Sequence, residues 1–209
     1  MSLQLSVASP EDLPDIVKAQ YAAFHPDNTM HRLIYPSPHP VPEMIIKRTI
    51  ARHLKTMEDP HVTWMKIVDT ESRSIIAAAK WIVWPPGEEV KEKRWPDKVD
   101  VTWVLPEEKG LNSGAGSDDQ EYVEWIMEEF FGRRRERIQG PAVLLDICFC
   151  APSHHRRGAG KQLVEWGTRR ADEVCFARFS FSASSFFENA IFSVLGLQSV
   201  LTKGFYSLV

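Results

Sequence analysis

The chain has 209 residues, of which 44% are hydrophobic and 25% charged, a composition typical of an ordinary folded domain. Its 25 Lys and Arg residues against 28 Asp and Glu residues give a formal net charge of −3. This balance argues against a general attraction to nucleic acid or to an anionic membrane, and no apolar run approaches the roughly 20 residues that span a bilayer. We therefore expect one domain over residues 1–209, without nucleic-acid or membrane partners.

The cysteines and the first residues indicate a reducing compartment. The chain has three cysteines, and Cys148 and Cys150 lie too close together on one predicted strand for an ordinary disulfide. The opening MSLQLSVASPEDL lacks the charged start and apolar core of a signal peptide. We expect a cytoplasmic protein, with import into an organelle as the open alternative.

The first quarter of the chain predicts a strand and two helices. Apolar and polar residues alternate over residues 3–7, which favours a strand. A helix should follow, with Ser9 as its N-cap and its end near Phe24. A proline-rich, aromatic connection covers residues 25–42, and apolar residues at helical spacing predict a second helix over 42–57.

The middle of the chain predicts a hairpin, a surface excursion and a long helix. Residues 61–68 and 74–83 read as two strands joined by a polar turn. Residues 88–117 are charged and then glycine-rich, which favours an excursion over the surface. Asp118 or Asp119 can cap a helix that continues to about Ile138.

The last third predicts alternating strands and helices. A strand ends at Cys150, a loop follows, and an amphipathic helix continues to about Val174. Beyond it we expect a strand over 176–181, a helix over 185–195 and final strands over 198–208. The pattern predicts a mixed α/β (α+β) domain.

The loop between Cys150 and the following helix is the most informative stretch. It places glycines and basic residues at the start of a helix, where free backbone N–H groups and the positive end of the helix dipole favour an anion. The loop residues are Arg156, Arg157, Gly158, Ala159, Gly160 and Lys161. Glycine lets a backbone amide approach a ligand closely, so we expect a phosphorylated ligand.

Two familiar phosphate loops do not fit this spacing. A Walker loop needs a glycine where His155 stands, and Ser or Thr where Gln162 stands. A dinucleotide fingerprint needs a third glycine where Leu163 stands. The ligand is therefore expected to be phosphorylated but held by another kind of loop.

The stretch resembles the acyl-CoA loop of the GNAT superfamily of N-acetyltransferases. That family's pattern is Gln or Arg, two residues, Gly, one residue, then Gly or Ala. Residues 155–160 match it except at the first position, where His155 stands. Cys150-Ala151-Pro152 is similar to the family's strand exit, the helix WGTRRADE is similar to that of fungal-type members, and the order of elements agrees over essentially the whole chain.

The resemblance implies a GNAT fold with a mostly antiparallel twisted sheet, splayed at the strands near 143–150 and 176–182 and flanked by helices. It also implies acetyl-CoA as co-substrate and transfer of its acetyl group to a small-molecule amine. Main-chain groups of Cys148, Phe149 and Cys150 would pair with the pantetheine arm, and Ser185 would lie beside the cofactor. The connection over 25–42 would shape the acceptor pocket. The protein would act as a monomer or a homodimer.

Two residues bear on proton transfer. Asp146, a carboxylate in an otherwise apolar strand, is the candidate general base, because burial favours proton uptake. A structural role, holding a neighbouring backbone group or arginine, is the favoured alternative. Phe192 stands where similar sequences carry a tyrosine that protonates the CoA thiolate.

Three functions stay open at this point. The leading hypothesis is an N-acetyltransferase. The second is a protein of the same fold that binds CoA without transferase activity, suggested by His155, Ala183 and Phe192. The third is a repurposed enzyme of small-molecule biosynthesis with a pocket lined by tryptophans, among them Trp81, Trp84, Trp95 and Trp103.

Overall fold

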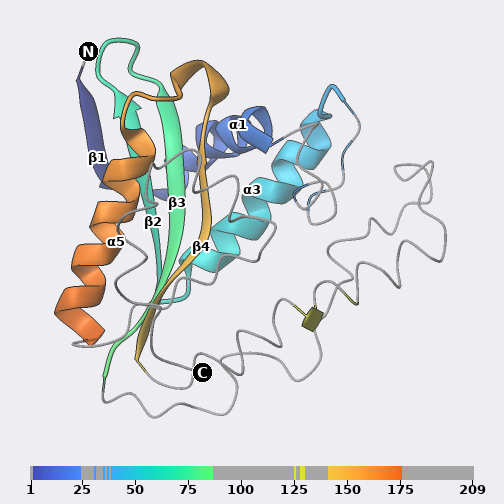
Figure 1. Ribbon diagram of the computed structural model, residues 1–209. Coiled ribbons are helices and arrows are strands. Elements are labelled where there is room, and N and C mark those ends of the chain that lie inside the picture. The colour runs from blue at the N-terminus through green and yellow to red at the C-terminus, as the bar shows by residue number, and fades with distance from the viewer. Residues whose placement is uncertain are drawn as a thin grey trace.

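The computed structural model describes residues 2–24, 31, 35, 37, 39–86, 125, 128, 129 and 141–175. Within these residues, four strands form one antiparallel sheet in the order β1-β2-β3-β4 (Figure 1). The strands are β1 (Leu3–Val7), β2 (Val62–Asp69), β3 (Ile75–Trp84) and β4 (Ala142–Cys150). Each strand therefore lies beside its neighbour along the described chain.

Helices cover both faces of the sheet (Figure 1). The helical elements are η1 (Pro10–Asp12), α1 (Leu13–Phe24), α3 (Glu43–Met57), η2 (Pro152–His154) and α5 (Ala159–Cys175). Helices α1 and α3 pack on one face, and α5 packs along β4 and β3 on the other. None of the helices in the described ranges is long and apolar enough to cross a membrane.

The start of the helical segment after β1 is fixed by a short polar turn. The carboxylate of Asp12 accepts hydrogen bonds from the backbone N–H of Ser9 (2.7 Å) and from its hydroxyl (3.1 Å). The same carboxylate pairs with the Lys66 ammonium on β2 at 2.5 Å. A local cap and a long-range ion pair thus hold α1 against the sheet.

The core lies on both sides of β3, which explains why this strand is apolar at nearly every position. Trp81 is fully buried on the α5 side, where its ring packs closely against Gly167 and lies near Trp166. On the other side, Phe149 packs edge-on against Phe24 of α1. A strand covered on both faces reads as a continuous hydrophobic run rather than an alternating one.

The structure confirms the predicted fold class, a mixed α/β domain with an antiparallel sheet flanked by helices. The strands predicted over 3–7, 61–68 and 74–83 are present within a residue or two, as are the helices predicted to end near Phe24 and Val174 and the helix over 42–57. Trp125, Glu128 and Glu129 are helical, inside the helix predicted to end near Ile138. The excursion over 88–117 and everything after residue 175, including the predicted splay partner near 176–182, lie outside the described residues.

Candidate functional site

The loop that joins β4 to α5 lies at the same end of the sheet as the turn between β2 and β3 (Figure 1). Backbone hydrogen bonds tie its first residues to the sheet, since the N–H of Ala151 donates to the carbonyl of Ile76 at 2.8 Å. The ring Nε2 of His155 donates to the carbonyl of Cys150 at 3.0 Å. The loop is therefore a fixed continuation of β4.

Two residues of this loop have left-handed backbone conformations. Arg156 has φ of 61° and Gly158 has φ of 88°. Only glycine adopts this region without steric cost, so Gly158 is required by the turn. A Cβ added at Gly158 would have no neighbouring atom within 4 Å, so the loop is open to solvent at this point.

Helix α5 begins at Ala159, immediately after this turn. Its first backbone hydrogen bond runs from the N–H of Gln162 to the carbonyl of Gly158, at 3.2 Å. The amides of the first turn precede that bond and have no partner within the helix pattern, and they lie at the positive end of the helix dipole. The structure thus brings Gly158, Ala159, Gly160 and Lys161 together at a helix start, a geometry that favours an anion.

The basic side chains of the loop do not all point the same way. Arg156 is exposed. Lys161 is also exposed, with its ammonium 3.6 Å from the carboxylate of Glu165 one turn further along α5.

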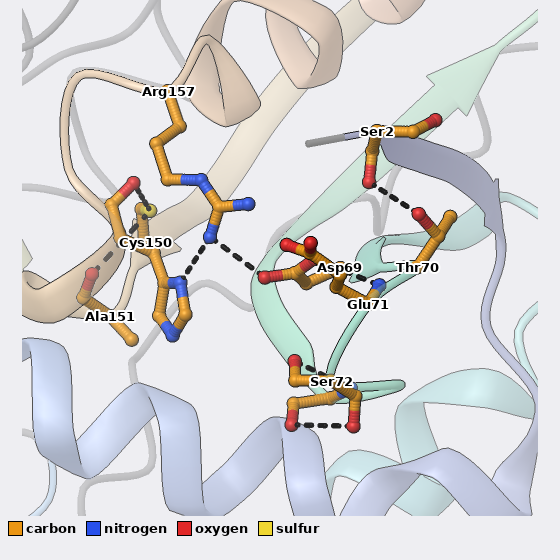
Figure 2. A network of polar contacts seen from close by, with 10 residues as sticks. Ser2, Asp69, Thr70, Glu71, Ser72, Cys150, Ala151 and Arg157 are labelled. Atoms are coloured by element: carbon orange, nitrogen blue, oxygen red, sulfur yellow. Dashed lines mark hydrogen bonds and ion pairs between the residues drawn. The ribbon is translucent and has the colours of Figure 1, made fainter.

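Arg157 is different, because its guanidinium is turned toward the sheet (Figure 2). Its Nη1 donates to Oδ2 of Asp69 at 2.8 Å and to Nδ1 of His154 at 2.7 Å. The hydrogen bond from Arg157 lowers the pKa of the Asp69 carboxyl and raises the pKa of Arg157. From the sequence, Arg157 is one of the residues of the expected phosphate-binding loop, and no local signal points to Asp69, which is 88 residues away.

The two cysteines at the end of β4 are poor candidates for a nucleophile. Their side chains pack against the core cluster on the α5 side of the sheet. Burial raises the pKa of the Cys148 thiol to about 12, and it also raises the pKa of the Cys150 thiol. Since the thiolate is the reactive form, both are structural at neutral pH.

The main chain of β4 keeps one side open to pairing within the described part of the chain. Residues 142–150 pair with β3 on one side, and no other described strand pairs with them. An unpaired strand edge offers rows of N–H and C=O groups to an extended ligand. Cys148, Phe149 and Cys150 lie on this strand, directly before the loop.

Asp146 lies at an irregularity in β4. Lys80 of β3 pairs with Ile147, and the next residue, Trp81, pairs with Leu145, so Asp146 is the extra residue of a bulge. Its Oδ2 is 2.5 Å from the ammonium of Lys80, and both side chains are largely buried. Bulges commonly redirect a side chain beside a functional site, and this one aims a carboxylate at a lysine.

A chain of buried polar groups, not found from the sequence, connects α1 and α3. The ring Nε2 of His53 donates to Oε1 of Gln20 at 2.8 Å, and the amide nitrogen of Gln20 lies 3.1 Å from Nε2 of His31. The His31 ring stacks between Phe24 and Tyr35. His31 and Tyr35 belong to the connection expected to shape the acceptor pocket.

Several residues named from the sequence lie outside the described part of the chain, namely Ser185, Ala183, Phe192, Trp95 and Trp103. Trp81 and Trp84 are buried in the core, so packing accounts for these two tryptophans.

No protein-family model matches the sequence, and no curated protein matches it. Solved structures do resemble the chain. A mosquito protein, arylalkylamine N-acetyltransferase like 5b, gives a TM-score of 0.55 at 12% identity, covering 92% of this chain and 81% of the mosquito chain. The histone acetyltransferase HPA2 and related acetyltransferase of Corynebacterium glutamicum gives 0.51 at 19% identity, covering 92% of this chain and 83% of that one.

A third similar structure carries a different description. It is a transcriptional regulator from Bacillus halodurans, with a TM-score of 0.52 at 14% identity, covering 100% of this chain and 95% of that one. Identities this low establish a shared fold and no more. The chain has the fold of GNAT acetyltransferases, and its activity has to be argued from its own site.

Proposed function

We propose that this chain, which has the fold of GNAT acetyltransferases, transfers an acetyl group from acetyl-CoA to a small-molecule amine. The observation that carries the proposal is the β4–α5 loop, where a left-handed, exposed Gly158 leads directly into the first turn of α5. Amides at a helix start bind phosphate groups, which are the charged part of CoA. The similar acetyltransferase structures support the same reading.

In this proposal the loop holds the diphosphate of CoA. The main-chain N–H groups of residues 158–161 donate to it, and the exposed side chains of Arg156 and Lys161 add charged donors. The edge of β4 that faces away from β3 pairs, at residues 148–150, with the pantetheine arm as an added strand would. Held in this way, the thioester lies beside β4, the strand that carries the Asp146 bulge. Positioning a reactant in this way lowers the barrier to acyl transfer.

Asp146 has two roles compatible with its geometry. It can accept the proton released by the attacking amine, or it can hold the bulge through its ion pair with Lys80. The short contact with Lys80 supports the structural role. The polar chain of Gln20, His31 and His53 lies on the same side of the sheet as α1 and α3, where the amine is expected to enter.

A second candidate function rests on Phe192. A phenylalanine has no proton for the departing thiolate, and loss of a general acid slows such a step on the order of 10²-fold. The chain would then bind CoA without efficient turnover. The third possibility, a biosynthetic reaction in the tryptophan-lined pocket, is weakened by the burial of Trp81 and Trp84 in the core.

One experiment separates these functions. The purified chain is mixed with acetyl-CoA and a panel of alkylamines, arylalkylamines and polyamines, and free CoA thiol is measured with a thiol-reactive dye. Amine-dependent thiol release supports the transferase, whereas CoA binding without release on any amine supports the second candidate. Gly158→Val is the matched control, because a branched residue is strained at a positive φ. If Gly158→Val binds CoA as tightly as the wild type, the loop is not the CoA site.

A further inference from the structure

Arg157 is the basic residue of the β4–α5 loop whose guanidinium turns away from the open face of the loop. Its Nη1 is shared between Asp69 and His154. Its Nη2 is buried and makes no hydrogen bond within the described part of the chain. Nη1, the nitrogen that pairs with Asp69 and His154, therefore serves contacts within the protein.

Asp69 is a firm anchor for this contact, because it also organises the hairpin turn. Its Oδ1 accepts the backbone N–H of Glu71 at 3.2 Å, while Oδ2 accepts Arg157 (Figure 2). Its backbone N–H donates to the carbonyl of Ser74, and its backbone carbonyl accepts from the N–H of Arg73. These two bonds close the turn. The side chain is almost completely buried, so it presents a fixed carboxylate to the loop.

His154 is the second partner of the Arg157 guanidinium, and this contact fixes which ring nitrogen of His154 accepts a hydrogen bond. Since Nη1 of Arg157 is a donor, Nδ1 of His154 must accept and carry no proton. The backbone N–H of His154 donates to Ala151 at 2.9 Å, which places the ring at the exit of β4. The two contacts fix Arg157 between the strained residue Arg156 and the left-handed Gly158.

From this geometry we infer that Arg157 is a positioning residue, which Asp69 and His154 clamp so that the amides of residues 158–161 face the CoA diphosphate. The inference rests on the proposed function and changes the role of one residue within it. Arg156 and Lys161 supply the positive charge that contacts the diphosphate, whereas Arg157 holds the conformation of the loop. Asp69, on a different strand, thereby becomes a determinant of CoA affinity without contacting CoA.

The substitution Asp69→Asn distinguishes this role from direct phosphate binding. A clamped Arg157 predicts that Asp69→Asn and Arg157→Gln each weaken CoA binding by about 10-fold and that the double variant is no weaker than either one. A phosphate-binding Arg157 predicts the reverse, because Asp69→Asn would release the guanidinium toward the ligand and leave affinity unchanged or higher. Isothermal titration with CoA gives the affinities.

Three further variants control this comparison. Arg157→Lys keeps the charge and can reach Asp69 with one hydrogen bond, so it should recover part of the lost affinity. Arg156→Gln should weaken CoA binding additively with Asp69→Asn. Lys66→Gln breaks a largely buried ion pair on the same strand without touching the loop, and should leave CoA affinity unchanged.

Hydrogen exchange of the free protein tests the clamp without any ligand. Asp69→Asn should speed exchange of the Gln162 amide, the first of α5 that is hydrogen-bonded, and leave the amides of β4 unchanged. Unchanged exchange at Gln162 overturns the clamp, even if CoA binds. If the wild type does not bind CoA, the proposed function fails, while the exchange result still decides whether Asp69 and Arg157 hold the loop.

Discussion

His53 shows how burial determines the chemistry of a single residue. It lies on the buried face of α3, where burial lowers its pKa well below the ordinary value, and the nearby Lys80 and Arg52 lower it further. The neutral ring donates from Nε2 to Gln20. Since Gln20 accepts that bond through its carbonyl oxygen, the chain to His31 orients the rings but cannot pass a proton along.

The depressed pKa of His53 predicts loss of stability at mildly acidic pH. The unfolded chain protonates His53 near its ordinary pKa of about 6.5, whereas the folded chain does not. The contribution is therefore fully present above about pH 6.5 and declines below it, by at most about 1.4 kcal/mol per pH unit. Urea unfolding between about pH 7 and pH 5 measures this slope.

A substitution tests whether His53 causes this pH dependence of the unfolding free energy. His53→Gln keeps an N–H donor for Gln20 but has no titration in this range, so its unfolding free energy should vary less with pH. An equal slope in His53→Gln and the wild type would contradict the assignment.

At the scale of elements, helix α5 uses two glycines for different purposes. Gly158 precedes the helix with a positive φ and open space around it. Gly167 lies inside the helix, where an added Cβ would fall 2.1 Å from Cη2 of Trp81. The first glycine is required by the backbone, and the second by the packing of the helix against β3.

The packing of Gly167 predicts that alanine has the opposite of its usual effect inside a helix. Gly to Ala in a helix normally stabilises by about 1 kcal/mol. Gly167→Ala should instead destabilise the protein by about 1–3 kcal/mol, because the methyl group overpacks the core against Trp81. The free energy of unfolding in urea measures it, and a more stable Gly167→Ala would show that α5 does not pack on Trp81 this closely.

At the scale of the whole molecule, ion pairs join segments that are far apart in the chain. Lys66 on β2 holds Asp12 at the start of the first helical segment, and Arg157 before α5 holds Asp69 at the end of β2. Burial opposes ionisation of Asp12, but hydrogen bonds from Lys66 and Ser9 outweigh it and lower its pKa. The pKa of Asp69 is lowered through Arg157.

These two carboxyl groups predict a second loss of stability in stronger acid. Their contribution is present above the unfolded pKa of about 3.9 and disappears as the pH falls through their lower folded values. Stability should therefore fall again below about pH 4. Acid unfolding followed by circular dichroism checks this, and Asp12→Asn should flatten the fall, because an amide does not titrate. A fall of the same steepness in Asp12→Asn would exclude a contribution from Asp12.

Much of this architecture is readable from local patterns. Alternation over residues 3–7, Ser9 before Pro10, and helical spacing over 42–57 each reflect the neighbours of a residue along the chain. The loop of Gly158 and Gly160 before an amphipathic helix is also a local signal. The bulge at Asp146 is not, because an extra residue in one strand is defined only by its pairing with Lys80 and Trp81 on the next strand.

The sequence by itself determined the fold class, the order of the strands and helices within the described residues and the position of the loop before α5, because hydrophobic periodicity and turn chemistry act between residues a few positions apart. Only the tertiary structure decided where the charged side chains point. Arg157 turns from the expected ligand to Asp69, and Asp146 to Lys80, because the sheet brings their partners within hydrogen-bonding distance. Which charges meet depends on strand order and register, which no local pattern encodes.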